Sequence, residues 1–122
     1  MYNEEVEIQG SFILLMETFY KDILFTIAPA GQRFGSRLSR IKAGMQAKKM
    51  GYRKACPDVM IFEPMNGFHG LFIEFKTKKG AVDPEQKKFI AKLIERNYHV
   101  EVAKSTAEGI DILQKYLQPE GR

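Results

Sequence analysis

Residues 57–76 read PDVMIFEPMNGFHGLFIEFK, and this stretch decides the fold of the chain. It contains two mainly apolar runs, Val59–Phe62 and Leu71–Lys76, rich in the β-branched and aromatic residues that favour strands. The two runs therefore predict a hairpin, whose turn is longer than the two-residue type. The turn-forming residues between the runs are Pro64, Asn66, Gly67 and Gly70.

The second run carries two ionisable residues, Glu74 and Lys76. Side chains alternate between faces along a strand, so both should share a side with Phe72. A hairpin places the start of its first strand beside the end of its second, which brings Asp58 close to both. Ionisable side chains on the inward side of an apolar run are costly unless each is paired or serves a ligand. We therefore expect Asp58, Glu74 and Lys76 to converge.

Such a cluster is suited to hold a divalent cation. Two neighbouring carboxylates repel each other unless a cation lies between them, and Mg²⁺ accepts this ligand set, with water and the backbone carbonyl of Phe75 completing its coordination. Such an ion binds a phosphate oxygen and lowers the pKa of a bound water. Lys76 would offset negative charge in the transition state, or orient or deprotonate the attacking water. The alternative is an exposed Glu74–Lys76 pair, with Asp58 serving only as a turn residue.

Upstream of the hairpin, helical and strand patterns alternate. Apolar residues recur at helical spacing over Glu4–Tyr20, and Ile23–Ala28 is a short β-rich run. A basic helical segment is expected from about Ser36 to Met50, ended by Gly51. The inward face of the first helix is expected to carry Ile8, Phe12, Leu15, Met16 and Phe19.

Downstream of the hairpin, capping signals predict a helix that begins after Asp83. Pro84 follows as a first-turn proline and Gln86 as a capping-box partner, and the helix runs to about Asn97. The residues expected to face inward are Phe89, Ile90, Leu93 and Ile94.

The chain then repeats a strand and a helix. Tyr98–Ala103 is a strand candidate, and Ser105 with Glu108 forms a second capping-box signature. The element order is helix, strand, helix, strand, strand, helix, strand, helix, which predicts an α/β fold with a mixed four-stranded sheet flanked by helices on both faces. The residues that the last helix is expected to bury are Ile110, Leu113 and Leu117.

Length and composition indicate an ordinary soluble protein with one core. At 122 residues and 14.0 kDa, the chain is expected to form a single domain over residues 1–122. Its longest apolar stretch, Phe12–Met16, is far too short to span a bilayer, so we expect no membrane association. The single cysteine, Cys56, cannot form an internal disulfide and reads as an inert thiol, which agrees with a cytoplasmic location.

Positive charge is concentrated in one part of the chain. The formal net charge is +4, yet no acidic residue lies between Asp22 and Asp58. Such a block would attract phosphates and give salt-sensitive DNA binding, although a solvated basic helix face is the alternative. Its members are Arg33, Arg37, Arg40, Lys42, Lys48, Lys49, Arg53 and Lys54.

The order of Pro57-Asp58 and Glu74-Phe75-Lys76 resembles the PD-(D/E)xK signature of the restriction-endonuclease-like superfamily. From Glu5 to about Leu117, the chain is similar to a stand-alone VRR-Nuc domain, the virus-type replication and repair nuclease module. The segments that carry the likeness also include Gly80, Pro84-Glu85-Gln86, Tyr98-His99-Val100 and Ser105-Thr106-Ala107-Glu108.

The resemblance assigns roles to five residues. It implies that Asp58 and Glu74 bind Mg²⁺ or Mn²⁺, that Lys76 is the active-site lysine, that Gln86 is the glutamine of the next helix, and that Glu5 is the first-helix acid. The alternatives are a helix cap for Gln86 and a solvated first-turn acid for Glu5. The segment 28–32 reads APAGQ, where family members commonly carry a run like IPNGG.

The resemblance also implies a function. Stand-alone members resemble small resolvases that cut branched DNA such as four-way (Holliday) junctions as homodimers, because symmetric cleavage needs two sites related by a two-fold axis. We therefore expect a metal-dependent endodeoxyribonuclease without an organic cofactor. The alternative is a nucleic-acid-binding or assembly module that keeps the fold but does not cut. A different phosphate-binding protein would need a GxxxxGK[ST] loop, which the sequence lacks.

Overall fold

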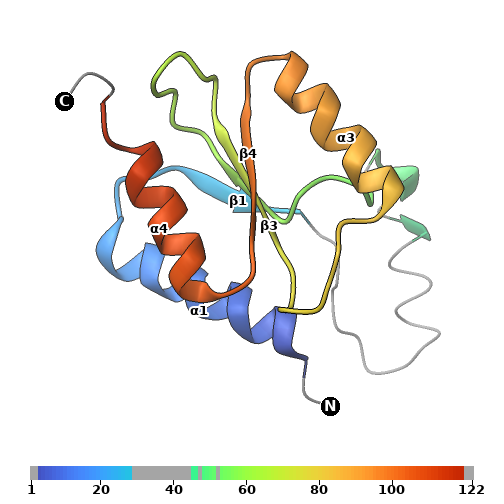
Figure 1. Cartoon of the computed structure of the whole chain (residues 1–122), viewed down its shortest axis with the longest axis horizontal. Coiled ribbons are helices and arrows are strands. Elements are labelled where there is room, and N and C mark those ends of the chain that lie inside the picture. The colour runs from blue at the N-terminus through green and yellow to red at the C-terminus, as the bar shows by residue number, and fades with distance from the viewer. Residues whose placement is uncertain (1–2, 29–44, 47, 52, 120–122) are drawn as a thin grey trace.

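The computed structural model describes residues 3–28, 45–46, 48–51 and 53–119, and its centre is a four-stranded mixed sheet (Figure 1). The strand order is β1-β2-β3-β4, with antiparallel pairing of β1 with β2 and of β2 with β3, and parallel pairing of β3 with β4. This confirms the predicted α/β class and mixed sheet. The strands are β1 (Phe25–Ile27), β2 (Val59–Ile61), β3 (Leu71–Phe75) and β4 (His99–Ala103).

The hairpin of β2 and β3 forms as expected, in the register that pairs Val59 with Ile73. Its connection contains a feature that the sequence analysis did not predict. Met65 and Phe68 form an isolated bridge, and Asn66 and Gly67 between them have φ values of 53° and 86°. Positive φ at two successive residues is typical of a two-residue hairpin turn, so a tight Asn-Gly turn lies inside the longer connection.

Helices lie on both faces of the sheet, as predicted. α1 (Glu4–Phe19) and α4 (Thr106–Tyr116) pack together against one face, and α3 (Pro84–Glu95) lies on the other side of the sheet (Figure 1). The core lies between the sheet and the α1–α4 pair. Its fully buried members from the strands are Val59, Ile61, Leu71, Ile73, Phe75 and Ala103, and those from the helices are Phe12, Met16 and Leu113.

Some of the expected inward positions are wrong. Phe19 is 72% exposed at the end of α1, and Ile94 is exposed on α3, although both follow the helical apolar spacing. Each lies in the last turn of its helix. Ile112 and Tyr116 are buried on α4 although the sequence analysis did not select them.

The helix caps are largely as predicted. Both halves of the capping box at the start of α3 are present, since Asp83 accepts from the Gln86 N–H and Gln86 accepts from the Asp83 N–H. At α4 the Ser105 side chain accepts from the Glu108 N–H, but the Glu108 carboxylate accepts from the N–H of Lys104 rather than of Ser105. The second capping box is therefore only half formed.

The predicted basic helix lies mostly outside the described residues. Residues 45–46 and 48–49 are helical, and Gly51 follows with a φ of 107°, a conformation that suits glycine after a helix. Within the described part of the chain, no helix is long and apolar enough to cross a membrane.

Candidate active site

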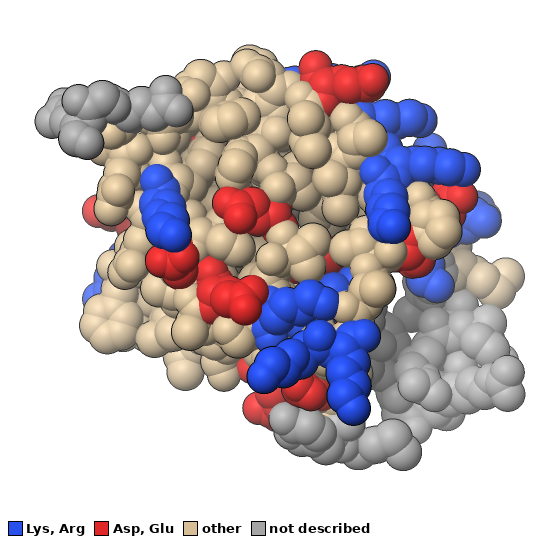
Figure 2. All heavy atoms as spheres, viewed as in Figure 1, with Lys and Arg blue, Asp and Glu red and all other residues tan. Residues whose placement is uncertain are grey.

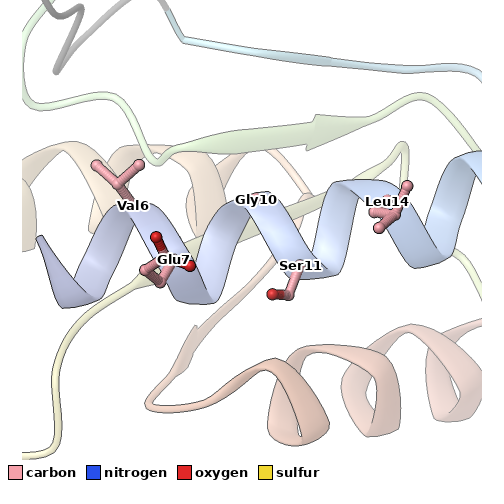
Figure 3. A pocket seen from close by; sticks show the side chains of 5 residues that line it. All are labelled: Val6, Glu7, Gly10, Ser11 and Leu14. Carbon is pink, nitrogen blue, oxygen red and sulfur yellow. The ribbon is translucent and has the colours of Figure 1, made fainter. Parts of the chain in front are cut away.

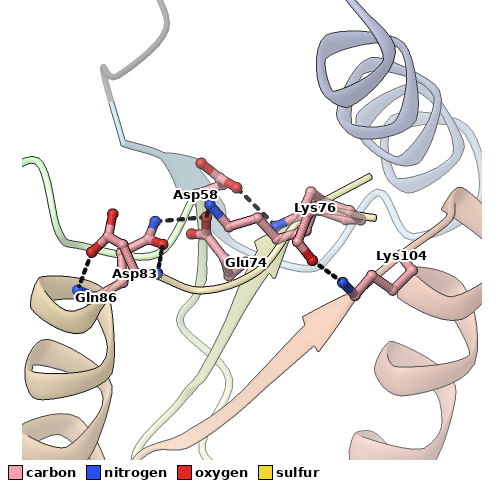
Figure 4. Close-up of polar contacts among 8 residues, drawn as sticks. Asp58, Glu74, Lys76, Asp83, Gln86 and Lys104 are labelled. Atoms are coloured by element: carbon pink, nitrogen blue, oxygen red, sulfur yellow. Dashed lines mark hydrogen bonds and ion pairs between the residues drawn. The ribbon is translucent and has the colours of Figure 1, made fainter. Parts of the chain in front are cut away.

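The open end of the β2–β3 hairpin brings the predicted site residues together. Because Val59 pairs with Ile73, Asp58 lies opposite Glu74. The Asp58 side chain is fixed there, since its Oδ2 accepts a hydrogen bond of 2.8 Å from the backbone N–H of Phe75. Figure 4 shows Asp58, Glu74, Lys76 and Gln86 gathered at the end of β3. The expected convergence is therefore present.

Glu74 is the most buried charged residue of this cluster, with 3% of its surface exposed. Its Oε2 accepts from Gln86 Nε2 at 2.9 Å and lies 3.3 Å from Lys76 Nζ. Its other oxygen, Oε1, is buried and has no hydrogen-bond partner within the described part of the chain. A buried carboxylate oxygen without a partner loses its hydration and gains nothing, so Oε1 marks a position where a ligand would be stabilising.

The pKa values of the two carboxylates also indicate a position for a cationic ligand. Burial, followed by the charge of Asp58, raises the pKa of Glu74 to about 7, while Lys76 and Gln86 oppose this shift. Burial is also the first cause that raises the pKa of Asp58, and the hydrogen bond from Phe75 opposes it. Burial thus disfavours the ionised form of both acids, and the charge of Asp58 adds to this effect at Glu74. A cation between the two carboxylates would stabilise both in the ionised form.

The donor set fits a hard divalent ion that keeps part of its water. Asp58 and Glu74 supply two carboxylates, and within the described residues no group of three His, Cys, Asp or Glu side chains forms a complete metal site. Mg²⁺ is commonly bound by one or two carboxylates together with waters and substrate phosphates, so two suffice. The carbonyl of Phe75 stays a predicted ligand. The contact that the structure shows is made by the N–H of Phe75, which donates a hydrogen bond to Asp58.

Gln86 forms the helix cap that the sequence analysis gave as one alternative, and it also contacts Glu74, while its active-site role stays a prediction. Its Oε1 accepts from the N–H of Asp83 at 3.2 Å and completes the cap of α3, while its Nε2 donates to Glu74 at 2.9 Å. The start of α3 is thereby tied to the end of β3. Gln86 thus orients the Glu74 carboxylate.

Glu5 and Cys56 lie near the same carboxylates. Glu5, half-buried in the first turn of α1, is close enough for its charge to raise the pKa of Asp58. The pKa of the Cys56 thiol is raised by burial first and then by Glu74 and Asp58. The sequence analysis did not place Cys56 near the site, although its position two residues before Asp58 is a usable signal.

Four of the predicted DNA-binding residues lie within the described part of the chain. Lys48, Lys49, Arg53 and Lys54 are all exposed, and Arg53 and Lys54 shortly precede Asp58 in the chain. Their binding role stays a prediction. Those that lie outside the described residues are Arg33, Arg37, Arg40 and Lys42, together with the 29–32 part of the segment that departs from the family pattern.

Lys104 was missed by the sequence analysis. The parallel register pairs Phe75 with Ala103, which brings Lys104 beside the residues that follow β3. Its Nζ donates to the carbonyl of Gly80 (Figure 4). Only the parallel pairing of two strands far apart in sequence reveals this position.

Two comparisons with known proteins, one with family models and one with solved structures, find the same kind of domain. The family model described as the VRR-NUC domain matches residues 24–107, a range that contains Asp58, Glu74, Lys76 and Gln86. A solved structure described as a VRR_NUC domain protein is 24% identical, with a TM-score of 0.67 over 96% of this chain and 90% of that one. At that identity the likeness supports the fold alone. No curated protein matches the chain.

Proposed function

This chain belongs to the VRR-NUC domain family, and we propose that it is a metal-dependent endodeoxyribonuclease that hydrolyses phosphodiester bonds of branched DNA such as four-way junctions. The observation that carries the proposal is the buried Glu74 Oε1 beside Asp58, which has no hydrogen-bond partner among the described residues, with the Lys76 ammonium 3.3 Å from the other Glu74 oxygen. Two carboxylates and one ammonium group in this arrangement are suited to phosphodiester hydrolysis. The family to which the chain belongs is nuclease-like.

The residues divide the work in the proposed reaction. Asp58 and Glu74 would hold Mg²⁺ or Mn²⁺, which on binding would polarise a phosphate oxygen and acidify water. Gln86 keeps Glu74 Oε2 directed towards Lys76, so that Oε1 remains available. Lys76, whose side chain is 14% exposed, presents a partly desolvated ammonium that offsets negative charge growing on the phosphate. Water adds to phosphorus and gives up one proton to solvent, the bond from phosphorus to the leaving oxygen breaks, and that oxygen takes up a proton from solvent.

The test is cleavage of labelled four-way junctions, flaps and linear duplexes with Mg²⁺, with Mn²⁺ or with EDTA. We expect metal-dependent cleavage, strongest on branched DNA. Asp58→Asn should abolish cleavage and preserve DNA binding. Asp111→Asn is the matched control, because Asp111 is an exposed acid on α4 that pairs with Lys115 at 3.1 Å. Cleavage in EDTA, or equal cleavage by the two variants, would refute the proposal. DNA binding by the wild type without cleavage of any substrate would favour a module that binds without cutting.

We further propose that the enzyme acts as a homodimer. Large apolar side chains are exposed on and just after α1, including Leu14 (64%), Phe19 and Leu24. The surface of α1 also carries a shallow hollow (Figure 3), which a second copy would fill. Burial of this apolar surface would stabilise the pair. The residues that line the hollow are Val6, Glu7, Gly10, Ser11 and Leu14.

A further inference from the structure

The turn that follows β3 carries a second group of cationic side chains, in addition to the predicted basic segment. This group lies on the side of Lys76 away from Gln86. The chain makes a turn over residues 77–80, closed by a hydrogen bond of 3.0 Å from the Gly80 N–H to the Thr77 carbonyl. Lys78 and Lys79 are exposed in this turn. In Figure 4, the side chains of Gln86 and Lys104 lie on opposite sides of Glu74 and Lys76.

The turn is held in a fixed place relative to the site. The N–H of Lys76 donates to the carbonyl of Ala103 at 3.0 Å, and Lys104 Nζ donates to the carbonyl of Gly80. Lys104 therefore acts as a positioning residue for the turn. Because Lys78 and Lys79 follow Lys76 by two and three residues, their backbones lie at most about 7–10 Å from it.

The charge of this surface is not neutralised locally. Within the described residues, none of Lys78, Lys79 and Lys104 has a carboxylate at ion-pair distance, whereas Lys88 and Lys115 each have one. Figure 2 shows positively charged side chains gathered over the turn after β3 and again along α3, with acidic atoms at the margin of the first group. The ammonium groups of the turn thus remain available for an anionic partner.

We propose that Lys78 and Lys79, held in place by Lys104, bind phosphates of the DNA strand next to the phosphate that is cut. This rests on the proposed function, since a scissile phosphate at Asp58 and Glu74 has neighbours along its strand every 3.4 Å of helix axis or so. Those neighbours come within reach of side chains that begin about 7–10 Å away. The contacts are to the backbone and carry no base preference.

The test measures DNA binding in EDTA by fluorescence anisotropy, at a series of salt concentrations, so that no cleavage is required. Lys78→Ala/Lys79→Ala should weaken binding equally on DNAs of different sequence. It should also reduce the slope of log K against log salt by about 1 for each lysine, or about 2 in total. The charge-preserving pair Lys78→Arg/Lys79→Arg should retain the wild-type slope.

The matched control is Lys21→Ala/Lys115→Ala, which removes the same charge far from the site. Lys21 lies just after the C-terminal end of α1, whereas Glu5 lies at the N-terminal end. A 16-residue helix is about 24 Å long, so the two ends are far apart. Lys115 lies in the last turn of α4, away from Lys104. Equal affinity and slope in the two alanine pairs would overturn the inference. If the wild type binds DNA but never cuts it, the nuclease proposal fails, while a slope difference between the pairs still supports the phosphate contact.

Discussion

Glu74 is the residue whose surroundings set the chemistry of the site. It is nearly fully buried, holds an ammonium and an amide on one oxygen, and leaves the other without a partner in the described structure. Such an arrangement lowers the stability of the folded protein when no ligand is bound. A ligand that binds there restores the lost stability. The cost is measurable as a dependence of stability on pH.

In EDTA, the wild type should lose stability as pH rises. The pKa of Glu74 is about 7 in the folded protein against an ordinary 4.5, so the folded state binds this proton more tightly than the unfolded state. The stabilisation is present below about 4.5 and is lost as pH rises through about 7, by about 3 kcal/mol at most. The difference between the free energies of unfolding measured by urea denaturation at pH 5 and at pH 8 tests this prediction.

Glu74→Gln is the control for this pH effect. A glutamine keeps the size of the side chain and does not titrate, so most of the loss between pH 5 and pH 8 should disappear. Mg²⁺ added to the wild type at pH 8 should restore stability, because it binds only the folded state. Wild-type stability that stays flat or rises over this range would contradict the account of Glu74.

Gln86 joins the helix cap to the carboxylate, and two substitutions separate these roles. Gln86→Ala should lower stability by about 1 kcal/mol through the lost cap and lower cleavage about 10–100-fold, as when the residue that orients a metal ligand is removed. Asp83→Ala should cost similar stability but keep most of the cleavage, since it leaves the Gln86–Glu74 bond in place. Equal cleavage by the two variants would show that Gln86 acts only as a cap.

At the level of the elements, Gly109 allows α4 to pack closely against α1 and β3. A Cβ built there would lie 2.9 Å from ring atoms of Phe12 and of Phe75. Gly109→Ala should therefore lower the free energy of unfolding by about 1–3 kcal/mol, because rigid rings must move. Gly10→Ala is the contrasting variant. Nothing lies within 4 Å of its Cβ position in the middle of α1, so it should raise the free energy of unfolding by about 1 kcal/mol. Urea denaturation of both variants decides, and a stabilised Gly109→Ala would contradict the packing of α4.

The elements were predictable where a local signal specifies them. The strands on either side of the Asn66-Gly67 turn, the cap at Asp83 and the alternation that places Glu74 on the same side of β3 as Lys76 all follow from short-range geometry. The exposure of Phe19 and Ile94 was not predictable, because helical periodicity does not tell which turns of a helix are covered by other parts of the chain. The positions of Lys104 and Cys56 depend on how strands and loops meet in three dimensions.

At the scale of the whole molecule, the exposed apolar surface of α1 leads to a prediction about assembly. Light scattering at micromolar concentration should give twice the mass of one chain. Leu14→Glu/Phe19→Glu should give a folded monomer, because charge would be buried at the contact. Met50→Glu is the control, since Met50 is also exposed but lies outside α1. A wild-type monomer, or dissociation by the control alone, would contradict this assembly.

The central claim is that Asp58 and Glu74 hold one divalent ion between them, and crystals soaked in Mn²⁺ test it most directly. The account predicts an anomalous difference peak within ligand distance of a carboxylate oxygen of Asp58 and of Glu74 Oε1, and no peak there in Glu74→Gln. An empty site at saturating Mn²⁺, or an ion bound elsewhere while the two carboxylates stay uncoordinated, would contradict it.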